Sequence, residues 1–217
     1  MKESEKPSED LGVEGMLGDL RKQIAECLPE IESLEKKEIA FKLLIYEAVF
    51  ATNFVPWMTN TWVRCQSDKA REVCVDNLLC EIKEDHPAML RNFVSVAEQH
   101  AGDVKIEEVT ESIRRIISRL TDLSRSPDAM NGLLIMAALE NTSLEFIPWM
   151  EKAAMKLGAT DLEYTKKHGM ADIEHANEFV VAVKSEAEHL GVLSDQLTQS
   201  NSLKLVSDLL QEIFSAK

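Results

Sequence analysis

Glycine, proline and aromatic residues are scarce in this chain of 217 residues, which has eight glycines, six prolines and 6% aromatic side chains. The few glycines and prolines lie between segments with helical spacing. No stretch alternates apolar and polar residues for long enough to predict a strand. We therefore expect an all-α protein.

Positive charge is also in short supply. The chain has 24 lysines and arginines against 38 aspartates and glutamates, which gives a net charge of −14. Such a charge repels phosphate backbones and anionic membrane surfaces. The first ten residues are charged, and no run approaches the roughly 20 apolar residues of a membrane-spanning helix. We therefore expect a cytoplasmic protein that binds neither nucleic acid nor membrane.

Cysteines are few and are not paired by any motif. Cys27, Cys65, Cys74 and Cys80 show no C-x-x-C spacing. Without a secretory context, this pattern favours reduced and mostly buried thiols over disulfides, a cysteine metal site or a nucleophile.

Helical segments fill most of the chain. Residues 1–10 are predicted to be a disordered polar tail, and the 45% of residues that are hydrophobic support one domain over 11–217. A first amphipathic helix contains Leu17 and ends before Pro29, and we predict caps or ends at Asp128, Thr160, Gly158 and Gly191. The remaining helices are predicted at 36–66, with a bend or interruption near Pro56, and at 68–84, 86–100, 105–125, 128–157, 160–190 and 200–216.

The sequence His168-Gly-Met-Ala-Asp172-Ile-Glu-His175 is the most informative segment. Positions i, i+4 and i+7 lie within a sector of roughly 60° on a helix. Two imidazoles and a carboxylate are ligands that iron, manganese and zinc share, so this stripe resembles half of a transition-metal site. The alternative is surface histidines at helical spacing by chance, but Tyr164 and Phe179 extend the stripe with apolar residues.

Glu140 is a candidate for the other half of the site. It shares a predicted helix face with Leu133, Met136, Ala137 and Leu144. A buried carboxylate costs several kcal/mol unless it is paired or bound to a metal, which makes this position a candidate ligand. The alternative is an exposed glutamate on a slightly rotated helix.

Glu81 and His86 form a third candidate group. They flank a short polar break, and Pro87 favours a new helix there, so the two side chains could meet across a kink. The alternative is a solvated helix end with His86 at a turn. Glu47 lies in an apolar run and is either a further ligand or a hydrogen-bonded structural residue. His100 and His189 have polar neighbours, and we interpret both as surface residues.

Together these residues resemble the heme-oxygenase-like diiron oxidases, which include iron-containing redox enzymes and chlamydial CADD-type proteins. The resemblance covers about 36–185, and its signature is a glutamate and a histidine, a mid-chain glutamate and then His-x3-Asp-x2-His. By that resemblance the metal ligands are Glu81, His86, Glu140, His168, Asp172 and His175. Family members usually place the first glutamate and histidine further apart, which leaves Asp76, Glu84 and Glu47 as substitutes for Glu81.

The resemblance implies a helical bundle of about seven or eight helices, two Fe(II) ions per chain and O2 as co-substrate. It also implies oxidation of a small molecule, for which we favour an amino acid or amine undergoing N-oxygenation, desaturation, C–C cleavage or nitrile formation. Long apolar helices suggest a homodimer. Aromatic or soft side chains near the ligands are candidates for the substrate pocket: Tyr46, Phe50, Trp57, Met136, Phe146, Trp149, Tyr164 and Phe179.

Three other interpretations stay open at this point. The resemblance also includes fatty-acid oxidative decarboxylases. A metal-free relative of the TenA or PqqC type would use a cysteine or bare acid–base groups, and Cys80 lies beside Glu81. A non-catalytic helical interaction module would tolerate loss of His168 or Glu140.

Overall fold

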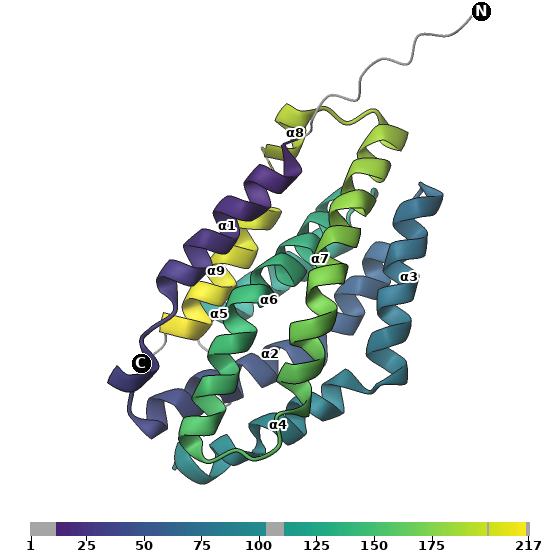
Figure 1. The fold of residues 1–217 in the computed structure, drawn as a ribbon. Helices are drawn as coiled ribbons and strands as arrows, with labels where there is room; N and C mark the ends of the chain where they lie inside the picture. Colours follow the sequence, from purple (N-terminus) through teal and green to yellow (C-terminus); the bar gives the residue numbers. More distant parts are fainter. Residues whose placement is uncertain (1–11, 103–110, 199, 216–217) are drawn as a thin grey trace, which may run out of the picture.

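The computed structural model describes residues 12–102, 111–198 and 200–215. Within these ranges the chain forms nine α-helices and one 3-10 helix, η1 (Ile31–Ser33), with no strand (Figure 1). The predicted all-α bundle is therefore confirmed. The α-helices are α1 (Val13–Cys27), α2 (Lys36–Trp62), α3 (Asp68–Lys83), α4 (His86–Ala101), α5 (Glu111–Ser124), α6 (Met130–Leu157), α7 (Glu163–Leu190), α8 (Ser194–Thr198) and α9 (Ser202–Ser215).

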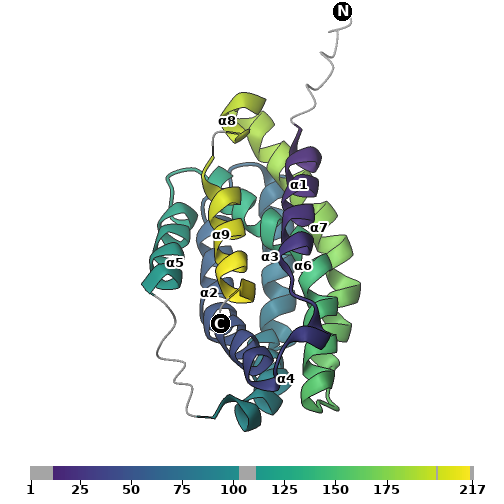
Figure 2. The same cartoon turned by 90° about the vertical axis from the view of Figure 1, so that its left-hand side faces the viewer.

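Helix α6 is the centre of the bundle. It packs along α7 and also contacts α1, α2, α4, α5 and α9, and Figure 2 shows α1 and α9 side by side. All residues from Gly132 to Glu140 are buried, because this stretch is apolar on nearly every face. Gly132 lies against α2, where a Cβ atom would collide with the side chain of Thr61. The core helix therefore fixes the direction in which Glu140 points.

Most of the predicted helix boundaries agree with the structure. Gly158 and Gly191 end α6 and α7 in the left-handed conformation, with φ of 102° and 66°. The N-cap of α6 is Ala129, one residue after the predicted Asp128, whose Oδ1 accepts a hydrogen bond from Met130 N at 3.1 Å. The predicted tail at 1–10 and the first residues of the 105–125 helix lie outside the described residues.

Two predicted boundaries are wrong. Helix α7 begins at Glu163 rather than after an N-cap at Thr160, because the carboxylate of Asp161 accepts the hydrogen bond from Glu163 N. Helix α2 ends at Trp62 rather than at residue 66, and it continues through Pro56. The short helix α8 was not predicted at all.

Helix α2 is long and apolar enough to cross a membrane by length and composition alone, contrary to the expectation that no segment is. Half of its most apolar window is buried inside the bundle. A helix that is apolar on nearly every face is also what the core of a helical bundle requires.

The minor sequence predictions have mixed outcomes. None of the four cysteines forms a disulfide, and Cys65 and Cys74 are buried with their sulfur atoms 3.8 Å apart. His189 is exposed, as expected. His100 is half-buried instead, because its Nε2 lies 2.9 Å from the carbonyl oxygen of Leu157 at the end of α6.

Candidate metal centre

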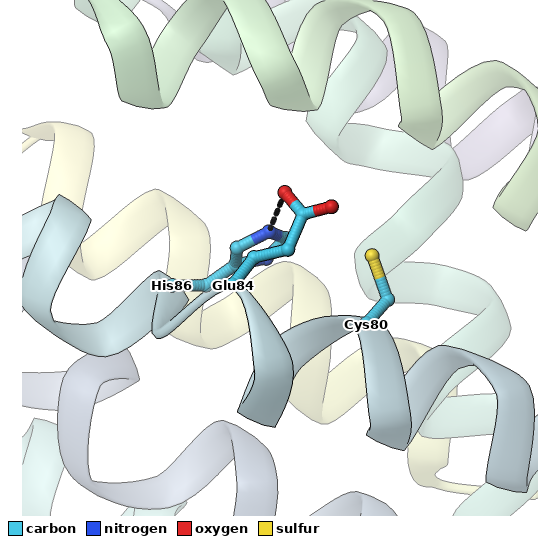
Figure 3. A group of neighbouring side chains, drawn as sticks. All are labelled: Cys80, Glu84 and His86. Carbon is cyan, nitrogen blue, oxygen red and sulfur yellow. Dashed lines mark hydrogen bonds and ion pairs between the residues drawn. The ribbon is translucent and has the colours of Figure 1, made fainter.

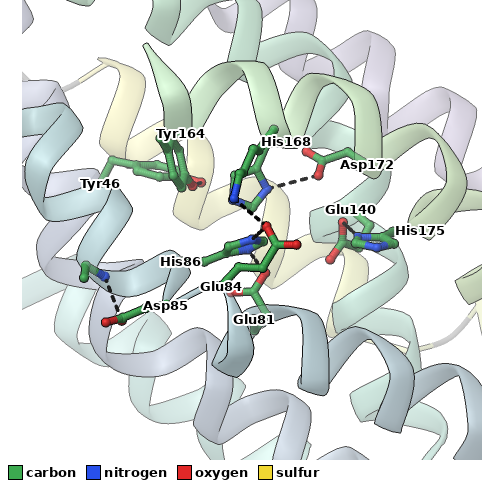
Figure 4. A network of polar contacts seen from close by, with 12 residues as sticks. Tyr46, Glu81, Glu84, Asp85, His86, Glu140, Tyr164, His168, Asp172 and His175 are labelled. Carbon is green, nitrogen blue, oxygen red and sulfur yellow. Dashed lines mark hydrogen bonds and ion pairs between the residues drawn. The ribbon is translucent and has the colours of Figure 1, made fainter. Parts of the chain in front are cut away.

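The six predicted ligands come together where the α3–α4 junction faces α6 and α7 (Figure 4). They form two groups, and within each group the ligand atoms lie within 4.8 Å of one another. We call Glu81, His86 and His168 the junction triad. We call Glu140, Asp172 and His175 the helical triad. Nitrogen and carboxylate oxygen donors in this number suit first-row transition metals.

Helix α7 presents its three ligands on one stripe, as the spacing predicts. The Nδ1 atom of His168 lies 3.1 Å from Oδ1 of Asp172. The other ring nitrogen, Nε2, is buried and has no hydrogen-bond partner among the described residues. A carboxylate that holds one nitrogen of an imidazole directs the lone pair of the other, which is the usual arrangement of a metal-bound histidine. The triads therefore fit a metal ion.

Negative charge surrounds both histidines of α7. Burial lowers the pKa of His168, but the hydrogen bond and charge of Asp172, joined by Glu81 and Glu140, outweigh burial and raise the pKa above its usual value. The pKa of His175 is likewise lowered by burial and raised, on balance, mainly by Glu140. Both shifts indicate a site that attracts positive charge.

Glu140 is buried on α6 at 6% exposure, as predicted from its apolar face. Its nearest charged partner is His175, whose Nδ1 lies 3.7 Å from Oε2, longer than a normal hydrogen bond. Burial raises the pKa of Glu140 to about 7, opposed by His175 and reinforced by the charge of Asp172. The carboxylate is therefore half protonated near neutral pH without a cation.

The α3–α4 junction brings Glu81 to His86. Asp85 adopts the left-handed conformation, with φ of 51°, and its side chain caps α4 by accepting a hydrogen bond from Ala88 N. Pro87 occupies the first turn of α4, where its missing N–H costs nothing. The chain changes direction within these residues, and Nδ1 of His86 lies 2.7 Å from Oε1 of Glu81.

The three substitute carboxylates lie in different surroundings. Glu84 is exposed, lies 3.5 Å from Nε2 of His86 and forms an ion pair with Lys167 at 2.8 Å. Asp76 is exposed and Glu47 is half-buried, and neither belongs to a metal-ligand group of the described residues. Burial raises the pKa of Glu47, and Arg91 opposes that shift. Glu81 is thus the carboxylate nearest to His86.

A cavity of about 50 Å³ adjoins the ligands. Of the predicted pocket residues, Tyr46, Phe50, Phe146 and Tyr164 line this cavity, and the two tyrosine hydroxyl oxygens are 3.4 Å apart. The other four lie outside its lining and are buried in the core: Trp57, Met136, Trp149 and Phe179.

Sequence reasoning missed several residues that line the cavity. They are Ala51, Phe54, Pro87, Leu90, Leu139, Ser143 and Ile147. Tyr46, Phe50 and Phe54 lie at positions i, i+4 and i+8 of α2 and share a helix face. This spacing was the signal that could have predicted Phe54 as a lining residue. The same rule links Ser143 to Glu140, three residues before it, and Leu139 to Ser143, four residues after it.

The fold and the two triads are typical of helical-bundle proteins that hold a metal ion between carboxylate and histidine side chains. Residues 42–197 match the model of a family described as iron-containing redox enzyme, and this range includes all six candidate ligands. The chain therefore belongs to that family, which confirms the heme-oxygenase-like resemblance and makes it an oxidoreductase of an iron-containing family. No curated protein matches the chain.

Proposed function

We propose that the protein is a non-heme diiron oxidase that uses O2 to oxidise a small amino acid or amine. The observation that supports this most directly is the pair of adjacent triads, in one of which the buried Nε2 of His168 has no hydrogen-bond partner among the described residues. Each triad offers three nitrogen or oxygen donors to one Fe(II) ion, so two ions per chain are expected.

Charge balance supports a pair of divalent ions. The carboxylates Glu81, Glu140 and Asp172 offset three of the four positive charges of two ferrous ions. In a buried site the remaining charge attracts an anionic ligand, such as reduced oxygen or a substrate carboxylate. When bound, the ferrous ions would supply electrons for the reduction of O2.

The surrounding residues orient the ligands and exclude water. Asp172 holds the ring of His168, and Glu81 holds the ring of His86. The aromatic rings of Phe50 and Phe146 close the cavity on the side of α2 and α6. Because burial raises the pKa of Glu140 to about 7, a cation competes with a proton for this carboxylate near neutral pH.

The size of the cavity favours a small substrate. At about 50 Å³ the cavity is far smaller than the roughly 300–1,000 Å³ typical of sites for drug-sized ligands. A long-chain fatty acid is therefore less well supported than an amino acid or amine.

The metal-free alternative is also weakened, because burial, Glu84 and Glu81 all raise the pKa of the Cys80 thiol and disfavour a nucleophilic thiolate. A cytoplasmic location and a homodimer stay predictions.

An anaerobic Fe(II) titration followed by mixing with O2 tests the proposal. We expect about two ions bound per chain and a transient change in visible absorption whose decay is accelerated by one of a set of candidate amino acids and amines. Glu47→Gln is the matched control, because it neutralises a half-buried carboxylate outside both triads. A protein that binds two ions and shows no absorption change with O2 would contradict the oxidase proposal.

A further inference from the structure

A third group of potential ligands lies beside the centre, on the solvent side of His86. The ligand atoms of Cys80, Glu84 and His86 lie within 4.8 Å of one another (Figure 3). Cys80 and Glu84 are one helical turn apart at the end of α3, and His86 begins α4. Cys80 is half-buried and the side chain of Glu84 is 43% exposed, so this group reaches solvent.

The ring of His86 faces two groups at once. Its Nδ1 lies 2.7 Å from Glu81, whereas its Nε2 lies 3.5 Å from Glu84 on the solvent side. A neutral imidazole has one lone pair and one N–H. When Glu81 accepts the N–H from Nδ1, the lone pair of Nε2 is directed toward Glu84 and Cys80. A carboxylate in this position orients the histidine as a metal ligand.

We propose that Cys80, Glu84 and His86 form an outer site for a divalent transition-metal ion, and that ions pass through it on their way to the triads. A bound ion displaces the proton of the Cys80 thiol to solvent. Thiolate, carboxylate and imidazole are together the donor set of zinc, cobalt and ferrous ions rather than of calcium or magnesium. This proposal departs from the sequence interpretation, which favours reduced thiols over a cysteine metal site. It does not depend on the proposed oxygen chemistry.

Burial of the triads explains why an entry site is useful. Glu81, Glu140 and Asp172 are 7%, 6% and 2% exposed, so an ion must lose its water before it reaches them. The outer group can replace that water one ligand at a time. Because His86 belongs to both the outer group and the junction triad, its ring passes an ion inward once the hydrogen bond between its Nδ1 and Glu81 is given up.

Lys167 forms an ion pair with the outer group. Its Nζ lies 2.8 Å from Oε2 of Glu84, and Lys167 directly precedes His168 on α7. An ammonium group and a divalent ion compete for the same carboxylate. Removal of the lysine charge therefore strengthens ion binding at the outer site.

Cobalt titration of the full-length, metal-free protein tests the outer site. We expect a near-ultraviolet absorption band from thiolate-to-cobalt charge transfer in the wild type, its loss in Cys80→Ser, and its retention in Cys27→Ser, which removes the other half-buried cysteine. Glu84→Gln should weaken the cobalt affinity at least about tenfold, and Lys167→Met should strengthen it. A band that persists in Cys80→Ser, or cobalt binding with no such band, would overturn the site.

The rate of iron uptake tests the entry role. Cys80→Ser should take up Fe(II) at least about tenfold more slowly than Cys27→Ser while reaching the same final stoichiometry. Equal rates would overturn the entry role, and a circular dichroism melt identifies any variant that fails to fold. Glu140→Gln should keep the cobalt band, because the outer site lies outside the helical triad. If the cobalt band is present but the iron-loaded protein does not react with O2, the proposed function is contradicted and the outer site is not.

Discussion

The two triads differ in how well their ligands are paired before a metal ion arrives. In the junction triad, Glu81 and His86 already form a contact of 2.7 Å. In the helical triad, Glu140 and His175 are 3.7 Å apart, and Asp172 adds a second buried carboxylate. A divalent ion therefore relieves more unpaired negative charge in the helical triad. We infer that the helical triad binds its ion first and more tightly.

Removal of Asp172 should have the largest effect, because this residue belongs to the helical triad and also orients His168 in the junction triad. We expect Asp172→Ala to weaken iron affinity at least about 100-fold and to abolish oxidase activity. The measurement is metal content after anaerobic loading and desalting. Retention of two tightly bound ions would show that Asp172 links neither triad to its metal.

Glu81→Gln should have a smaller effect and should act on one ion. We expect about one Fe(II) per chain to remain tightly bound and the second to bind about tenfold more weakly. Glu140→Gln should instead weaken the first ion. The two variants are compared in the same anaerobic titration, and equal losses in both would remove the distinction between the triads.

Iron affinity should depend on pH through the helical triad. The pKa of Glu140 is raised to about 7, so below that pH a proton competes with the ion. We expect the affinity for the first ion to rise by up to about tenfold per pH unit as the pH approaches 7 from below and then to level off. Equilibrium titrations over this range provide the measurement. Affinity that falls with rising pH contradicts the assignment of Glu140.

The metal-free protein should be destabilised by Glu140 as the pH rises. The pKa of Glu140 in the folded protein, about 7, exceeds its ordinary value of 4.5, so the unfolded chain releases this proton at a lower pH. The free energy of unfolding therefore falls as the pH rises from 4.5 to about 7. We therefore expect metal-free Glu140→Gln to be about 1–3 kcal/mol more stable than the wild type above this range. The difference should disappear below it. Urea unfolding at both ends of the range distinguishes these outcomes.

Asp85 should give the smallest effect. Its left-handed conformation is strained, but its side chain caps α4. Asp85→Gly therefore relieves the backbone strain and loses the capping hydrogen bond. We expect a change within about 1 kcal/mol for Asp85→Gly and a loss of about 1–2 kcal/mol for Asp85→Ala, which keeps the strain and loses the cap. Thermal unfolding checks the order, and a more stable Asp85→Ala variant would contradict it.

Periodicity explains which parts of this molecule the sequence predicts. The stripe on α7 and the inward direction of Glu140 follow from residues three or four apart on one helix, and the meeting of Glu81 with His86 follows from Pro87 and the polar break. The pocket was harder to predict. Trp57 and Trp149 lie in the core because the packing of α2 and α6 sets which aromatic residues face the ligands.

Local competition between neighbouring residues explains the boundary errors. Thr160 and Asp161 are both good capping residues, and only the backbone geometry decides that Asp161 bonds to the start of α7. The partner of His86 was ambiguous for a similar reason. Glu81 and Glu84 both lie near its ring, on opposite nitrogens, and spacing along the sequence does not distinguish them.

Anomalous diffraction at the iron edge from crystals loaded anaerobically with Fe(II) is the most direct test of the central claim. We expect two iron peaks, one bounded by Glu140, Asp172 and His175 and one bounded by Glu81, His86 and His168, with the helical-triad peak at higher occupancy under limiting iron. A structure in which Nε2 of His168 contacts no iron, or in which a single ion fills the space between the triads, would contradict the claim.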